Sequence, residues 1–140
     1  MKGNNLKNCD FCKLINQPDT PEYIASLKFG KLFLNRNQIY LGRVFYIYKE
    51  HLRDITEISI TELRDAETEI HQIASIIRNE FSPDLINVAS LGNHVQHLHW
   101  HIIPRYKTDI NWGHPPWPHE NWFPNDDEKF SLVQRIKKHL

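Results

Sequence analysis

The sequence predicts an α+β protein, and three segments carry that prediction. Residues 59–81 repeat apolar side chains at three- and four-residue steps, which is typical of an amphipathic helix. Residues 39–49 are rich in β-branched and aromatic types, and residues 95–103 alternate in polarity, which are both strand patterns. The length of 140 residues fits one domain, so we expect a single domain spanning 1–140.

The charge balance and the N-terminal residues exclude several classes of protein. Seventeen basic and 17 acidic side chains cancel, whereas a general nucleic-acid binder carries a basic excess. No apolar run approaches the ~20 residues that a membrane helix needs. Residues 1–8 lack the apolar core of a secretory signal. We therefore expect a cytoplasmic protein with neither a nucleic acid nor a membrane as its partner.

The first third of the chain is interpreted as an arm followed by a hairpin. Residues 1–30 contain a pair of cysteines and two prolines and are expected to form loops with a short strand near Lys28. Residues 31–35 and 39–49 are the predicted strands. The polar stretch between them is long enough to join them as a hairpin.

The central helix and the two strands after it follow from local signals. Ser59 and Glu62 have the spacing of a capping box, which places the start of the 59–81 helix. Residues 85–91 and 95–103 are predicted strands joined by a glycine-containing turn. Pro104 is expected to end the second strand or to lie at a sheet edge.

A proline- and tryptophan-rich loop and a second helix complete the chain. Residues 109–125 form the loop, and residues 126–140 form a helix with acids first and bases last, as the helix dipole favours. The loop is either an irregular flap packed by its own aromatic rings, or a wall of a ligand site to which Trp112 contributes, or a contact for a partner.

Three histidines in the 95–103 strand indicate chemistry. His97, His99 and His101 alternate with apolar residues, so their imidazoles share one face of the strand. A largely neutral imidazole can attack phosphorus, and a neighbouring imidazole can hydrogen-bond the leaving oxygen. The pattern therefore predicts a nucleophilic phosphate site. Two other interpretations remain: a purely structural role and a metal site, because His-x-His on a strand also suits zinc.

The segment 92–105, Gly-Asn-His-Val-Gln-His-Leu-His-Trp-His-Ile-Ile-Pro-Arg, resembles the signature of the histidine-triad (HIT) superfamily. The likeness extends more weakly from Cys9 to the Trp-rich loop and is greatest to bacterial members that resemble diadenosine-tetraphosphate hydrolases. The resemblance implies an antiparallel sheet of about five strands with a long helix across one face. It also implies a homodimer and a small-molecule nucleotide as the substrate.

The resemblance further implies roles for the site residues. His99 would be the nucleophile that takes up a nucleoside monophosphate, and His101 would contact the phosphate or the leaving oxygen. Nucleotidyl hydrolase or transferase activity would follow, with no cofactor required for the chemistry. Two other functions stay open at this point: a non-catalytic nucleotide-binding or interaction module, and a metal-dependent hydrolase that uses the three histidines as ligands.

Three further residues are candidates for substrate binding. Asn35 lies eight residues before Arg43, where dinucleotide-hydrolase relatives have a ribose-binding asparagine eight residues before a fourth histidine. Asn35 could equally be a turn residue. Arg43 replaces that histidine and could bind a phosphate but cannot act as a base. Asn93 stands where the family often has glutamine before the triad.

The cysteine pair indicates a structural zinc site. Cys9 and Cys12 have the spacing of two zinc-binding thiolates, and such pairs in a reducing compartment are seldom structural disulfides. His51 and His97 are the candidates for the other two ligands. Zinc-bearing relatives in the superfamily use the corresponding residues. The alternative is a pair of free thiols in the arm.

Overall fold

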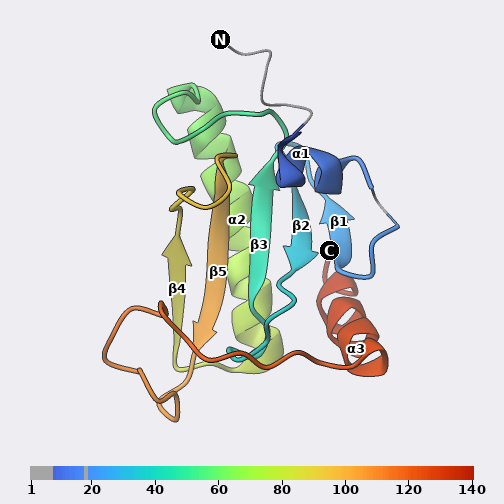
Figure 1. Cartoon of the computed structure of the whole chain (residues 1–140), viewed down its shortest axis with the longest axis vertical. Helices are drawn as coiled ribbons and strands as arrows, with labels where there is room; N and C mark the ends of the chain where they lie inside the picture. The colour runs from blue at the N-terminus through green and yellow to red at the C-terminus, as the bar shows by residue number, and fades with distance from the viewer. Residues whose placement is uncertain (1–7, 18) are drawn as a thin grey trace.

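The computed structural model describes residues 8–17 and 19–140, which form one five-stranded antiparallel sheet with helices on both faces (Figure 1). The strands lie in the order β1-β2-β3-β5-β4. The elements in chain order are α1 (Asp10–Ile15), β1 (Tyr23–Ser26), β2 (Gly30–Leu34), β3 (Val44–Tyr48), α2 (Ile60–Phe81), β4 (Leu85–Ala89), β5 (His99–Arg105) and α3 (Asp126–Lys137).

The predicted hairpin is confirmed, but its second strand is shorter than expected. β2 and β3 pair antiparallel from Gly30 opposite Tyr48 to Leu34 opposite Val44. Residues 39–43 leave the strand direction as a turn, in which Gly42 has a φ of +91°. The strand-like composition of residues 39–49 did not predict this turn. A strand pattern carries no information about the left-handed backbone conformation, which only glycine adopts readily.

The long helix covers one face of the sheet. Ser59 caps α2 through a bond from the Glu62 amide to its hydroxyl, and the helix ends at Phe81 as the sequence predicts. The predicted apolar stripe is buried against β3 and β5, and Figure 1 shows α2 behind the strands. Residues from both layers form the core, including Val44, Trp100 and Ile73.

The N-terminal segment is less loop-like than the predicted arm. It contains α1, and its strand is β1 (Tyr23–Ser26) rather than a strand near Lys28, which lies in the turn before β2. α1 lies on the face of the sheet opposite α2 (Figure 1). The Phe11 ring of α1 stacks on Phe45 of β3 with 5.4 Å between ring centroids.

The histidine strand begins later than the alternation indicates. β5 starts at His99, whereas residues 92–98 form a bent segment. This segment still follows the sheet, because the Leu98 carbonyl accepts a bond from the Tyr48 amide and the Leu98 amide donates to the Leu52 carbonyl. Pro104 lies past the end of β3 and pairs with β4 alone, so its missing N–H interrupts no ladder on that side.

The loop and the closing helix agree with the sequence. Residues 109–125 are irregular and cross the ends of the strands to reach α3, whose N-cap is Asn125. α3 ends at Lys137, three residues before the predicted end, and packs on β1 and α2. Among the described residues, no helix has the length and hydropathy needed to cross a membrane.

Candidate functional site

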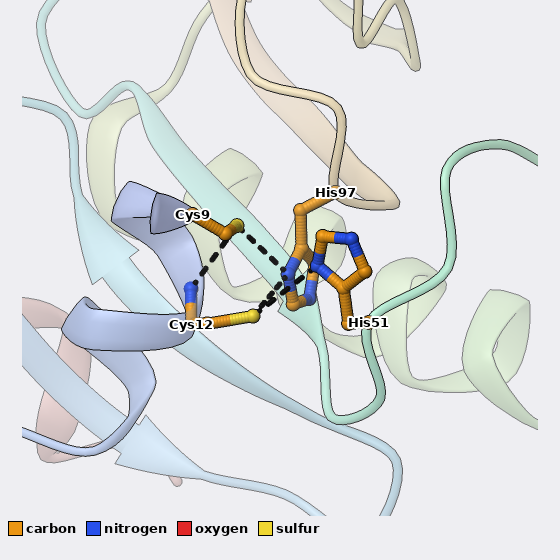
Figure 2. A group of neighbouring side chains, drawn as sticks. All are labelled: Cys9, Cys12, His51 and His97. Atoms are coloured by element: carbon orange, nitrogen blue, oxygen red, sulfur yellow. Dashed lines mark hydrogen bonds between the residues drawn. The ribbon is translucent and has the colours of Figure 1, made fainter. Parts of the chain in front are cut away.

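Two cysteines and two histidines converge at the end of β3. Cys9 is the N-cap of α1, Cys12 lies in its first turn, His51 follows β3, and His97 precedes β5. One ligand atom from each of the four lies within 4.8 Å of every other (Figure 2). The four residues that the sequence analysis names as candidate metal ligands therefore lie together, although 88 positions separate the first from the last.

The separations match a tetrahedral zinc ion. Zn–S and Zn–N bonds of usual length place a sulfur and a nitrogen ligand about 3.5 Å apart at the tetrahedral angle. The Nδ1 atom of His97 lies 3.5 Å from the Cys9 sulfur and 3.4 Å from the Cys12 sulfur. The Nδ1 atom of His51 lies 3.2 Å from the Cys12 sulfur. The residues present thus fit the ion.

The backbone fixes which nitrogen of His97 faces the thiols. Its Nε2–H donates to the Tyr48 carbonyl at 2.8 Å, so Nδ1 carries the free electron pair. That arrangement is the one that zinc-binding histidines use, with one nitrogen on the metal and the other on a backbone oxygen. Burial, and then the neighbouring Cys9, raise the pKa of the Cys12 thiol to about 12, a cost that a bound cation would remove.

A second backbone contact fixes the tautomer of His99. Its Nδ1–H donates to the carbonyl of His97 at 2.5 Å, which leaves an electron pair on Nε2. The side chain is 5% exposed, and burial lowers its pKa below the ordinary value. A neutral imidazole with a free Nε2 has the electronic form that a nucleophile requires.

His101 continues the same face of β5. Its ring lies 5.0 Å from that of His99 and 5.1 Å from Trp117 of the loop. Burial, and then the nearby Arg43 cation, lower the pKa of His101 to about 3, so the ring is neutral at physiological pH. Its Nδ1 atom is buried and has no partner among the described residues.

Aromatic rings enclose the two histidines. Phe11 of α1 packs edge-on to His99 at 4.7 Å, and Phe45 of β3 lies beside His101 at 6.4 Å. Together with Trp117, these rings give the two imidazoles largely aromatic surroundings. Low polarity around the site strengthens every electrostatic interaction made within it.

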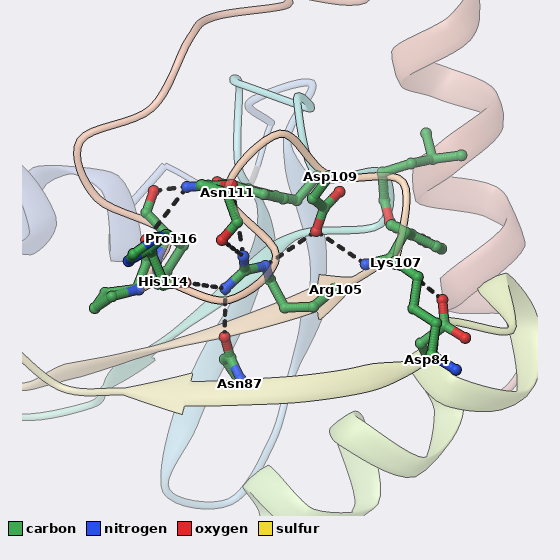
Figure 3. Close-up of polar contacts among 12 residues, drawn as sticks. Asp84, Asn87, Arg105, Lys107, Asp109, Asn111, His114 and Pro116 are labelled. Carbon is green, nitrogen blue, oxygen red and sulfur yellow. Dashed lines mark hydrogen bonds and ion pairs between the residues drawn. The ribbon is translucent and has the colours of Figure 1, made fainter.

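The loop that carries Trp117 is anchored at both ends. Arg105, at the end of β5, forms an ion pair with Asp109 and donates to Asn87, to the Asn111 carbonyl and to the His114 carbonyl (Figure 3). At the other end of the loop, the Asn37 side chain donates a hydrogen bond to the Asn121 side chain and accepts one from the Trp122 amide. These contacts hold the loop in place, with Trp117 against His101.

The predicted substrate-binding residues have different surroundings in the structure. Arg43 packs on the Trp117 ring that also contacts His101. Asn35 uses its side-chain oxygen in a turn, where it accepts a bond from the Asn37 amide. Asn93 is exposed in the bent segment.

Several residues at the site escaped the sequence analysis. Trp117, rather than Trp112, contacts the triad, and Phe11 and His119 take part as well. A proline-rich loop offers no periodicity, so the sequence alone could not indicate which of its aromatic residues points inward. Phe11 lies between the two cysteines and could have been inferred only by assuming that the metal ligands converge.

Comparisons with known proteins find relatives of the histidine-triad type. The family model described as HIT domain matches residues 28–108. "Protein hit" of Bacillus subtilis is 30% identical over 112 residues, which are 76% of this chain and 77% of that protein. The asymmetrical bis(5'-nucleosyl)-tetraphosphatase of Schizosaccharomyces pombe is 29% identical over 89 residues, which are 60% of this chain and 49% of that protein.

Solved structures show the same fold. A histidine triad protein from Sinorhizobium meliloti has a TM-score of 0.80 at 19% identity, with 96% of this chain and 99% of that chain covered. A Zn-bound histidine triad family protein from Mycobacterium smegmatis has a TM-score of 0.74 at 19% identity, with 95% of each chain covered. The α+β fold expected from the resemblance is confirmed, and this chain belongs to the HIT-domain family.

Proposed function

We propose that this chain is a nucleotidyl hydrolase or transferase in which the Nε2 atom of His99 attacks the α-phosphate of a nucleotide. The observation that carries the proposal is the bond from His99 Nδ1–H to the His97 carbonyl, which leaves Nε2 unprotonated. A tetraphosphatase among the relatives supports a dinucleoside polyphosphate or a similar conjugate as the substrate.

The reaction follows from the positions of two imidazoles. Nε2 of His99 forms a bond to phosphorus as the bond to the leaving oxygen breaks, and the leaving oxygen keeps the electron pair. His101, held neutral 5.0 Å away, hydrogen-bonds the phosphoryl or leaving oxygen. Water or another acceptor then attacks the nucleotidyl-histidine, and His99 regains its electron pair.

His97 serves the site through its backbone and its metal contacts. Its ring is fully buried, and both nitrogens are used, so the phosphate is contacted by His99 and His101 instead. The resident metal of this proposal is zinc held by Cys9, Cys12, His51 and His97. When bound, the ion would supply a cross-link between α1 and the sheet rather than a reactive group.

The proposal also keeps the homodimer and the cytoplasmic location that the sequence analysis expects. β4 is one of the two edge strands of the sheet, and its Leu85 and Val88 side chains are about half exposed, as is Leu91 just beyond it. Exposed apolar side chains at an open strand edge are suited to burial in an interface. Sedimentation velocity of the purified chain tests the dimer.

The test of the function is to trap the covalent intermediate. Wild-type protein that is mixed with diadenosine tetraphosphate and rapidly quenched at alkaline pH, where the N–P bond survives, should gain the mass of one adenylyl group on His99. His99→Ala should remain folded by circular dichroism and lose both the adduct and turnover by at least about a thousandfold. The matched control is His94→Ala, an exposed histidine of the same segment, which should retain activity within about twofold. Full activity of His99→Ala would overturn the mechanism.

A further inference from the structure

Arg43 is a buried cation without an anion beside it. The side chain is 3% exposed, and no carboxylate of residues 8–17 or 19–140 lies within 4.0 Å of its guanidinium. Its Nε atom is buried with no hydrogen-bond partner. Arg105, also buried, provides the contrast, because it has an ion pair with Asp109 and four further bonds. Buried charges are normally paired, so Arg43 lacks a partner of opposite charge.

The loop holds the Arg43 guanidinium in position. Its Nη1 donates to Nε2 of His119 at 2.8 Å, and the Nδ1–H of His119 donates in turn to the Glu120 carbonyl at 2.7 Å. The guanidinium carbon lies 5.4 Å from the Trp117 ring. These contacts orient Arg43 without neutralising it, and burial lowers its pKa only to about 10, so it stays charged near neutral pH.

The unpaired cation lies beside the proposed reaction centre. Trp117 contacts both Arg43 and His101, and the Arg43 charge depresses the basicity of His101. The Nδ1 atom of His101 is the other buried polar atom here without a partner. An uncompensated guanidinium and a neutral imidazole against one aromatic ring form a setting that a ligand with negative charge would complete.

The geometry points to Arg43, positioned by His119, as the binding residue for an anionic leaving group, so that the chain prefers nucleotides whose α-phosphate is linked to another phosphate. This inference rests on the proposed attack by His99. When the P–O bond to the next phosphate breaks, the electron pair goes to the bridging oxygen and adds negative charge to the leaving phosphate. A fixed guanidinium stabilises that charge, and the leaving phosphate requires no proton.

A neutral leaving group requires a proton rather than a fixed positive charge. An amine that leaves from a phosphoramidate must gain a proton as the P–N bond breaks, and it carries no negative charge for Arg43 to stabilise. His101 beside Arg43 is a neutral imidazole and is a poor acid for that purpose. The Arg43 subsite therefore selects polyphosphate-linked substrates through charge.

The test compares two substrates that share an adenosine 5'-phosphoryl group. Wild-type kcat/KM should be at least about tenfold higher for diadenosine tetraphosphate than for adenosine 5'-phosphoramidate. Arg43→Gln should reduce kcat/KM for the tetraphosphate by at least about tenfold and for the phosphoramidate by less than about threefold. His119→Ala should shift selectivity in the same direction, and His119→Gln, which keeps an acceptor for Nη1, should restore it.

Two outcomes overturn the inference and leave the proposed function standing. One is a wild-type preference for the phosphoramidate; the other is an equal loss on both substrates in a folded Arg43→Gln variant. If Arg43→Gln does not fold, binding of inorganic tripolyphosphate to wild type and to Arg43→Lys is measured by calorimetry instead. Wild type should bind this probe, and Arg43→Lys should bind it at least about fivefold more weakly. Equal binding overturns the inference. Absence of an adenylyl adduct from either substrate would instead reject the attack by His99.

Discussion

Acidification should destabilise the fold through His101. Burial and the Arg43 cation lower the pKa of this imidazole in the folded protein from 6.5 to about 3. Between these values the unfolded chain binds more protons at His101 than the folded chain does, so the free energy of unfolding falls as the pH falls below 6.5. Integrating over that interval gives a loss of about 2 kcal/mol at pH 5 relative to pH 8 from this one residue.

Urea unfolding at pH 8 and pH 5, followed by tryptophan fluorescence, measures this loss. Wild type should lose more than that amount, because burial also lowers the pKa of His97 and of His99. His101→Gln cannot titrate and should lose about 2 kcal/mol less than wild type over the same interval. The control is His71→Gln, at an exposed position of α2, which should match wild type. An identical loss in His101→Gln and wild type would refute the reasoning.

Three further predictions address the metal site and the fold. The purified wild-type chain should carry about one zinc ion by plasma mass spectrometry, and Cys12→Ser should not; wild type that stays metal-free after reconstitution with zinc would contradict this. Gly42→Ala should cost about 1–3 kcal/mol in urea unfolding, since its φ is +91° and the new Cβ would lie 2.6 Å from an aromatic carbon. Gly113→Ala, which meets no atom within 4 Å, is its control and should be near neutral. Ile73→Ala, at a fully buried position of α2, should cost about 2–5 kcal/mol in the same assay, and a loss below about 1 kcal/mol would exclude the packing assigned to it.

The elements that the sequence predicted well are those set by local patterns. α2 begins and ends where the cap and the apolar repeat place it, because side-chain periodicity and capping are properties of neighbouring residues. β5 was shifted, since the alternation of histidines continues through the bent segment at His97 although the ladder with β3 starts at His99. Alternation of polarity indicates which face of the sheet a side chain lies on. It does not indicate where pairing with the neighbouring strand begins.

The parts of the site that the sequence did not predict depend on contacts across long separations. Arg43 and His119 are 76 positions apart, and their contact requires the loop to fold back over β5. Nothing in the composition of 109–125 distinguishes Trp117, which faces the triad, from Trp122, which is 42% exposed. The four candidate metal ligands were predicted to lie together in spite of comparable separations because thiolate and imidazole have few other uses at that spacing.

Three atoms of His97 connect the candidate metal site to the side chain of His99. Its Nδ1 faces the cysteine sulfurs, its Nε2–H donates to the Tyr48 carbonyl, and its own carbonyl accepts the Nδ1–H of His99. The residue is held outside β5, so its position depends on these contacts rather than on a strand ladder. A cation that fixes the His97 ring would thus also fix the carbonyl that selects the reactive tautomer of His99. If His99 is the nucleophile as proposed, the Cys-x-x-Cys pair, 85 positions or more from His97 in the chain, would act on it through His97 without touching the substrate.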